Sequence, residues 1–310
     1  MATTDAEYKS NLNAAILNGS ISASDLHALI AEYEENGDQH IFFYKVPESP
    51  LFDRITSFEK ASSDLFGLNW GKSIKFPSYS KPGMELEWID FRKGRDSHEI
   101  WVGKLHLEET GFRNAGEKKR ISGTQYEQPM EICKYRVVFV VRMLMDGILE
   151  VRISRDGNTS FKVMNERLNS AWEALDSLVK LRQVSPWDLA GSRTKQLRTS
   201  LADVGKNSLS YSVVGCSLQD SEDGSVKFSA NGSIFQAAAS QTAMRAFIQD
   251  SSGTCKSLAI KLMKIRSENK LRTDLRVAIG GHSTNEVVIL SKIDANAFRY
   301  VAEHLKFFDS

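Results

Sequence analysis

An alternation of apolar and polar positions predicts two β-hairpins in the first half of the chain. The segments with this period of two are residues 84–92 and 99–107, then residues 135–145 and 148–154. A turn at residues 93–96 separates the first pair, and the dipeptide Asp146-Gly147 separates the second. Asp-Gly supplies the positive φ angles that a two-residue hairpin turn needs. With a buried strand at residues 40–46, these segments predict an antiparallel sheet.

Helical periodicity, with apolar residues three or four positions apart, predicts several helices. The segments that show it are residues 8–17, 51–66, 165–182, 193–204, 237–248 and 256–266. A further N-terminal helix is predicted to begin near Ser22 or Ser24 and to end at Gly37, and Asp294 is expected to cap a final helix.

Further short strands complete the predicted elements. They are residues 160–163, 209–218, 226–235, 275–279 and 286–290. Residues 183–192 are interpreted as a linker, because Pro186 breaks the helix before it and the composition turns basic beyond it.

The predicted fold class is therefore α+β. We expect an acidic helical segment at residues 1–39 and an antiparallel, β-rich α+β domain with a packed helix at 40–182. After the linker we expect a second, smaller, basic α+β domain at 193–310. The length of 310 residues, with 41% hydrophobic and 25% charged residues, favours two domains with real cores and excludes collagen-like and low-complexity chains.

Charge is distributed unevenly, although the formal net charge is only +1. Residues 1–39 carry seven acidic residues against the lone Lys9, a net of −6. From Lys180 to the end there are 18 basic and 12 acidic residues, a net of +6. An acidic head therefore precedes a basic second half, and the head is expected either to cover a basic surface as a brake or to pack its apolar face on the sheet.

The strongest functional signal is a run of cations between residues 256 and 276. It consists of Lys256, Lys261, Lys264, Arg266, Lys270, Arg272 and Arg276, against only Glu268 and Asp274. On the predicted helix, Lys261 and Lys264 lie on one side, which suits a row of phosphates. The predicted helix at 193–204 extends this patch by Arg193, Lys195 and Arg198. The patch predicts binding to the backbone of DNA or RNA with little base preference.

Motifs for catalysis and metal binding are weak. The loop at residues 67–73 ends in Gly-Lys-Ser, but Phe66 stands where a phosphate-binding loop needs its first glycine. His98, His106 and Glu108 cannot form a local metal triad and are interpreted as surface residues. No cofactor or metal is expected.

A metal-dependent nuclease would use Asp90 and Glu99 as ligands, with Lys104 nearby. Asp146, Glu150 and Arg152 form a similar set on the second hairpin. Charged residues on the exposed face of an antiparallel sheet account for both sets more simply.

The three cysteines, Cys133, Cys216 and Cys255, have no metal-binding spacing, which favours a reducing cytoplasm. Neither a secretion signal nor a membrane span is expected. The leading hypothesis is a non-enzymatic cytoplasmic protein that binds nucleic acid and assembles with itself, as a homo-oligomer, or with a protein partner. The alternatives are an adaptor or scaffold without nucleic acid, and the metal-dependent nuclease.

Overall fold

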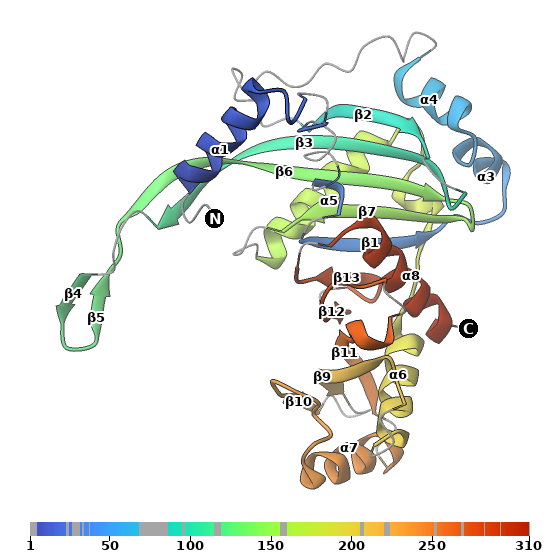
Figure 1. Cartoon of the computed structure of the whole chain (residues 1–310). Helices are drawn as coiled ribbons and strands as arrows, with labels where there is room; N and C mark the ends of the chain where they lie inside the picture. The colour runs from blue at the N-terminus through green and yellow to red at the C-terminus, as the bar shows by residue number, and fades with distance from the viewer. Residues whose placement is uncertain are drawn as a thin grey trace.

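The chain forms one antiparallel sheet of 11 strands with helices on both of its faces (Figure 1). The computed structural model describes residues 5–309 apart from 23–24, 27–31, 33, 37, 68–85, 95–96, 115–118, 156–159, 205–207, 220–223, 251–252, 268–269, 282 and 292. The strands follow the order β10-β9-β11-β12-β13-β1-β7-β6-β3-β2, and β8 also pairs with β1. The predicted α+β class is confirmed.

The N-terminal half of the sheet contains both predicted hairpins. Its strands are β1 (Gln39–Lys45), β2 (Glu87–Lys93), β3 (Glu99–Asn114), β6 (Met130–Leu144) and β7 (Ile148–Ser154). Gly147 adopts a φ of 79° in the turn between β6 and β7, as the Asp-Gly pair predicts. β3 and β6 continue beyond the body as a two-stranded arm that ends in β4 (Lys119–Ser122) and β5 (Gln125–Glu127) (Figure 1).

Helices cover one face of this half. They are α3 (Pro50–Ile55), α4 (Phe58–Phe66) and α5 (Phe161–Leu175). Trp172 of α5 packs edge-on against Tyr44 of β1, with ring centroids 4.8 Å apart. The single helix predicted at 51–66 is two helices, because the Ser57 hydroxyl caps a new start by accepting a hydrogen bond from the Lys60 amide. The strand predicted at 160–163 is wrong, since Ser160 caps α5 in the same way.

The N-terminal prediction is tested only in part. The first helix, α1 (Asp5–Leu17), is confirmed, and its described side chains at positions 10–17 are mostly exposed. Much of the second predicted helix, including Gly37, lies outside the described residues. Of its described residues, Glu34 and Glu35 lie against the face of the sheet opposite α5, as their contacts below show.

The C-terminal half adds five strands and three helices. The strands are β9 (Tyr211–Gln219), β10 (Ser225–Ser229), β11 (Thr254–Leu262), β12 (Leu275–Ile279) and β13 (Glu286–Ile289). The helices are α6 (Ala190–Ala202), α7 (Ala238–Asp250) and α8 (Ala295–Asp309), and the Asp294 carboxylate caps α8 at the Ala297 amide as predicted. Strand β10 is shorter than the predicted 226–235.

The helix predicted at 256–266 is wrong. This segment is strand β11 followed by a short 3-10 turn, η2 (Lys264–Arg266). Leu258, Ile260 and Leu262 alternate into the core, and β11 pairs with β9 on one side and β12 on the other. Helices α6 and α8 supply the core side chains that face it, among them Leu197 and Leu305.

The sheet continues through the predicted domain boundary. A second 3-10 turn, η1 (Leu181–Gln183), leads to β8 (Ser185–Pro186), which pairs with the end of β1. Trp187 and Leu189 of the predicted linker are buried in the core. Along the same edge, nearer its start, β1 pairs with β13, so that His40 lies opposite Val288. A separate second domain is therefore not confirmed, and the predicted division stays a prediction. None of the described helices is long and apolar enough to span a lipid bilayer.

Candidate functional site

The predicted basic residues of the run at 256–276 lie on strands and turns, whereas Arg193, Lys195 and Arg198 lie on helix α6. Lys261 of β11 lies opposite Arg276 of β12 on one flank and Ser212 of β9 on the other. Residues directly opposite each other in paired strands share a face. This face is opposite to the one that Ile260 and Leu262 bury under α6 and α8, and we call it the open face.

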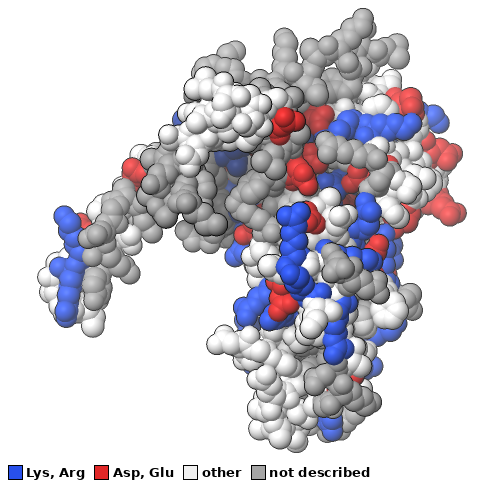
Figure 2. Space-filling model, viewed as in Figure 1, with Lys and Arg blue, Asp and Glu red and all other residues white. Residues whose placement is uncertain are grey.

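The open face carries cations, hydroxyls and small side chains. Lys227 of β10 lies opposite Ser217, which in turn lies opposite Ser257 of β11. Lys227 and Arg276 are both exposed. The guanidinium of Arg276 reaches the backbone oxygen of Asn231, just past β10, at 3.4 Å. In Figure 1, α6 and α8 lie on one side of these strands, and Figure 2 shows Lys and Arg gathered over this half of the molecule and on the tip of the arm.

Several of the predicted cations are partly neutralised. Lys261 pairs with Asp274 at 2.8 Å, Lys270 with Glu303 at 3.1 Å and Arg272 with Asp294 at 3.1 Å. The other four cations of this run are exposed: Lys256, Lys264, Arg266 and Arg276. The run therefore keeps a basic surface, with less charge than the sequence suggests.

Arg193 is a structural residue, although the sequence places it in the solvent-facing patch. It is 2% exposed, and its guanidinium donates hydrogen bonds to the backbone oxygens of Cys255 at 2.9 Å and Thr284 at 3.1 Å. Lys195 and Arg198 are exposed on α6, which packs on the face opposite Lys261. The structure therefore does not bring these three residues together with the open face.

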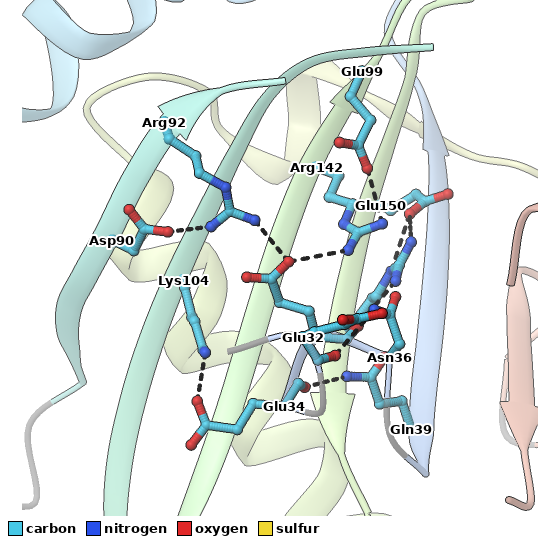
Figure 3. A network of polar contacts seen from close by, with 12 residues as sticks. Glu32, Glu34, Asn36, Gln39, Asp90, Arg92, Glu99, Lys104, Arg142 and Glu150 are labelled. Atoms are coloured by element: carbon cyan, nitrogen blue, oxygen red, sulfur yellow. Dashed lines mark hydrogen bonds and ion pairs between the residues drawn. The ribbon is translucent and has the colours of Figure 1, made fainter. Parts of the chain in front are cut away.

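A network of ion pairs is buried on the face of the N-terminal half that lies opposite α5 (Figure 3). Glu35 contacts Arg92 at 2.6 Å and Arg142 at 3.5 Å. Arg142 also contacts Glu99 at 2.9 Å, and Arg92 pairs with Asp90. The residues that join Glu35 in this network lie on β2, β3 and β6, and the segment that carries Glu35 covers them. They are Asp90, Arg92, Glu99 and Arg142.

The innermost pair of this network is Glu150 and Arg152 on β7. Their contact is 2.6 Å, and each side chain is 1% exposed. The Arg152 guanidinium lies 3.4 Å from the ring centroid of Phe298 on α8. Burial, together with the neighbouring Arg142, lowers the pKa of Arg152 to about 10, even though Glu150 acts in the opposite direction. Arg152 is still charged at neutral pH and depends on Glu150 as its counter-ion.

Glu34 contacts neighbouring basic side chains on the same face of the sheet, opposite α5. It pairs with Lys104 and lies 3.6 Å from both His106 and Arg136. Burial alone would raise the pKa of Glu34, but His106 and Lys104 outweigh it and lower the pKa to about 2. His106 is buried, not a surface residue as the sequence suggests, and burial lowers its pKa.

The Glu34 contacts predict a specific loss of stability in acid. The folded pKa of about 2 lies below the ordinary value of 4.5, so the stabilisation is complete above pH 4.5 and is lost as the pH falls towards 2. We expect Glu34→Gln to lower the melting temperature at neutral pH, and the difference from the unmodified chain to shrink below pH 4.5. Glu166→Gln, at an exposed site on α5, is the control. A Glu34→Gln difference that stays constant across this pH range would contradict the assignment.

The acidic head therefore does contact basic side chains of its own chain. Glu34 and Glu35 contact residues of β2, β3 and β6, and not the run at 256–276. No sequence pattern links these two glutamates to strands so far along the chain. The sequence signal that could have indicated a buried ion-pair network is the placing of charged residues at alternate positions of a predicted strand, such as Glu150 and Arg152.

The carboxylates proposed for a nuclease are engaged with cations. Asp90 and Glu99 pair with arginines as described, and Asp146 pairs with Lys306 on α8. No three His, Cys, Asp or Glu side chains of the described part of the chain gather closely enough to hold a metal ion. Burial raises the pKa of Cys216 and of Cys255 to about 12, so both thiols are protonated at neutral pH.

Comparison with known proteins adds no assignment, since no family model and no curated protein matches the chain significantly.

Proposed function

We propose that the protein binds the phosphate backbone of double-stranded nucleic acid through the open face of β10, β9, β11 and β12. The observation that carries the proposal is the exposure of Lys227 and Arg276 on the face that α6 and α8 leave uncovered, with Lys261 between them. Lys and Arg side chains that neutralise phosphates release counter-ions, which supplies most of the affinity of non-specific binding.

The chemistry of this face favours phosphate over base contacts. Its other described side chains include Ser212, Ser217 and Ser257, and hydroxyls hydrogen-bond phosphate oxygens without reading sequence. The aromatic residues of β9 and β10, Tyr211 and Phe228, pack towards the core. Single strands are held by stacking of their bases on aromatic rings, and the described part of this face presents no such ring, so a duplex is the better ligand.

Salt dependence is the first test. Each phosphate neutralised on a duplex contributes about −0.9 to the slope of log affinity against log salt concentration. With three cations on the face we expect a slope of about −2 to −3, measured by fluorescence anisotropy on labelled DNA and RNA duplexes. Two duplexes of unrelated sequence should give the same affinity. A slope near zero, or a strong preference for one sequence, would contradict backbone binding by this face.

The two-stranded arm formed by β3 and β6 is the feature that favours the alternative function, an adaptor that binds other proteins. Its described side chains include exposed apolar ones, namely Ile121, Met130 and Ile132. Exposed apolar groups of this kind are typical of contact surfaces between proteins. Assembly with a second copy or a protein partner stays a prediction, compatible with duplex binding elsewhere on the molecule.

A further inference from the structure

The arm has two strand edges that no described strand covers. β2 pairs with β3 only as far as His106, and β7 pairs with β6 only between Met143 and Phe139. Beyond these points the ribbon of β3 and β6 continues to Asn114 and Met130, and Figure 1 shows it extending away from the body. A two-stranded ribbon is marginally stable in water, and an uncovered edge is a template for pairing with another strand.

The outer edge of β6 presents backbone groups at its even-numbered positions. The Val138 amide points to the β7 side of the strand, where it donates to the Ser154 hydroxyl at 2.9 Å. Backbone groups alternate between the two sides along an antiparallel strand. The amides and carbonyls of Ile132 and Lys134 therefore point away from β3, at the part of the edge that β7 does not cover.

The side chains favour the edge of β6 as an interface. Met130 and Ile132 are 55% and 71% exposed, and residues at alternate positions lie on one face of the strand. Exposed apolar side chains grouped in this way are typical of contact surfaces. The edge of β3 is less suited to pairing with its own copy. An antiparallel register centred on Glu108 or Glu109 places that residue opposite itself, and like charges opposite each other are destabilising.

The charges of β6 restrict how two copies of this edge can pair. An antiparallel pair of identical strands has a twofold axis, and the residue at the axis lies opposite itself. An axis at Glu131 or Lys134 therefore opposes two like charges, and an axis at Tyr135 sets Lys134 opposite Arg136. An axis at Cys133 opposes no like charges, because it sets Glu131 opposite Tyr135.

The length of the edge also favours an axis at Cys133. An axis at Ile132 pairs only residues 130–134 of β6, whereas an axis at Cys133 pairs residues 130–136. The second strand then begins at Met130, opposite Arg136, and stops short of Phe139, where the pairing with β7 begins. This register uses the uncovered edge most fully.

We propose that two copies of the chain form a dimer through their arms, with the β6 edges paired antiparallel about a twofold axis at Cys133. The two ribbons then make one four-stranded sheet, in which Ile132 of each copy packs on the aliphatic part of Lys134 of the other. The interface lies on the N-terminal half of the sheet, away from the open face. It does not depend on the proposed binding of nucleic acid.

Cross-linking of the full chain with a short bis-maleimide tests the axis. Cys133 is half-buried, whereas Cys216 and Cys255 are buried, so the reagent reacts at Cys133. We expect a covalent dimer at a chain concentration of about 100 μM, because an interface of this size is weak. Cys133→Ser should abolish the dimer. In that background Lys119→Cys, exposed at the arm tip, should not restore it. No dimer, or equal cross-linking at Lys119→Cys, would overturn the proposal.

Two matched proline variants identify the edge. Ile132→Pro removes an amide that points across the proposed interface. Thr110→Pro removes an amide at the outer edge of β3, because Thr110 lies opposite Lys134. Neither amide joins β3 to β6, and edge positions of this kind tolerate proline. By sedimentation equilibrium we expect Ile132→Pro to weaken dimerisation at least about tenfold, and Thr110→Pro to leave it within about threefold.

A charge provides the same comparison if a proline variant does not fold. Ile132→Lys sets a second cation opposite Lys134 of the other copy and should weaken dimerisation in the same way. Thr110→Lys, exposed on the other edge, is its control. Equal effects at positions 132 and 110, or unchanged dimerisation in a folded Ile132 variant, would contradict pairing through the β6 edge.

Discussion

Glu150→Ala is expected to destabilise the protein by about 3–5 kcal/mol, because it leaves the buried guanidinium of Arg152 without its counter-ion. Arg152 is 1% exposed and has Glu150 as its closest carboxylate, at 2.6 Å. The backbone oxygen of Glu35, at 3.1 Å, and the ring of Phe298 remain after the substitution, but neither carries a charge. A typical domain has only about 5–15 kcal/mol of total stability, so chemical denaturation should show a large shift of the midpoint.

Two comparisons separate the lost counter-ion from other effects. The double variant Glu150→Leu, Arg152→Met removes both charges and should recover most of the loss, since apolar replacements of buried pairs are often close to neutral. The exposed pair Lys162–Glu166 on α5, with side chains 86% and 61% exposed, is the control. Glu166→Ala should change stability by less than about 0.5 kcal/mol. A Glu150→Ala variant as stable as this control would contradict the role assigned to the pair.

The elements that the sequence predicts correctly depend on local chemistry. The hairpin at Asp146-Gly147 needs only a turn that tolerates positive φ, and Asp294 needs only free amides at the start of α8. Strand β11 was misread because Leu258, Leu262 and Ile265 fit a helical period while Leu258, Ile260 and Leu262 fit a strand. Pairing with β9 and β12, which lie elsewhere in the sequence, decides between the two.

The site was harder to predict than the fold. Charged residues on alternate strand positions were expected to face solvent, as on a one-sided antiparallel sheet. In the structure, Glu35 and α8 cover Arg142 and Arg152 from positions more than a hundred residues away in the chain. The sequence assigns Arg193 to the basic patch, but the side chain is buried. Its hydrogen bonds to the backbone oxygens of Cys255 and Thr284 join distant parts of the chain, so no local sequence pattern reveals them.

The proposed duplex binding makes a direct prediction for two matched charge reversals. Lys227→Glu with Arg276→Glu changes the open face, and Lys195→Glu with Arg198→Glu changes the outer side of α6, which packs on the opposite face of the sheet. Both variants lower the net charge by the same amount, so a general electrostatic effect acts on both equally. All four positions are exposed, and both variants are expected to fold.

The deciding measurement is the affinity of these two variants for one labelled duplex at a single salt concentration near 0.1 M, with melting temperatures to confirm folding. We expect the open-face variant to bind about 100-fold more weakly, which corresponds to about 1.4 kcal/mol for each lost contact with a phosphate. The α6 variant should bind within about threefold of the unmodified chain, because charges a Debye length or more away are largely screened. Equal losses in the two variants, or no loss in a folded open-face variant, would contradict the claim that the open face binds nucleic acid.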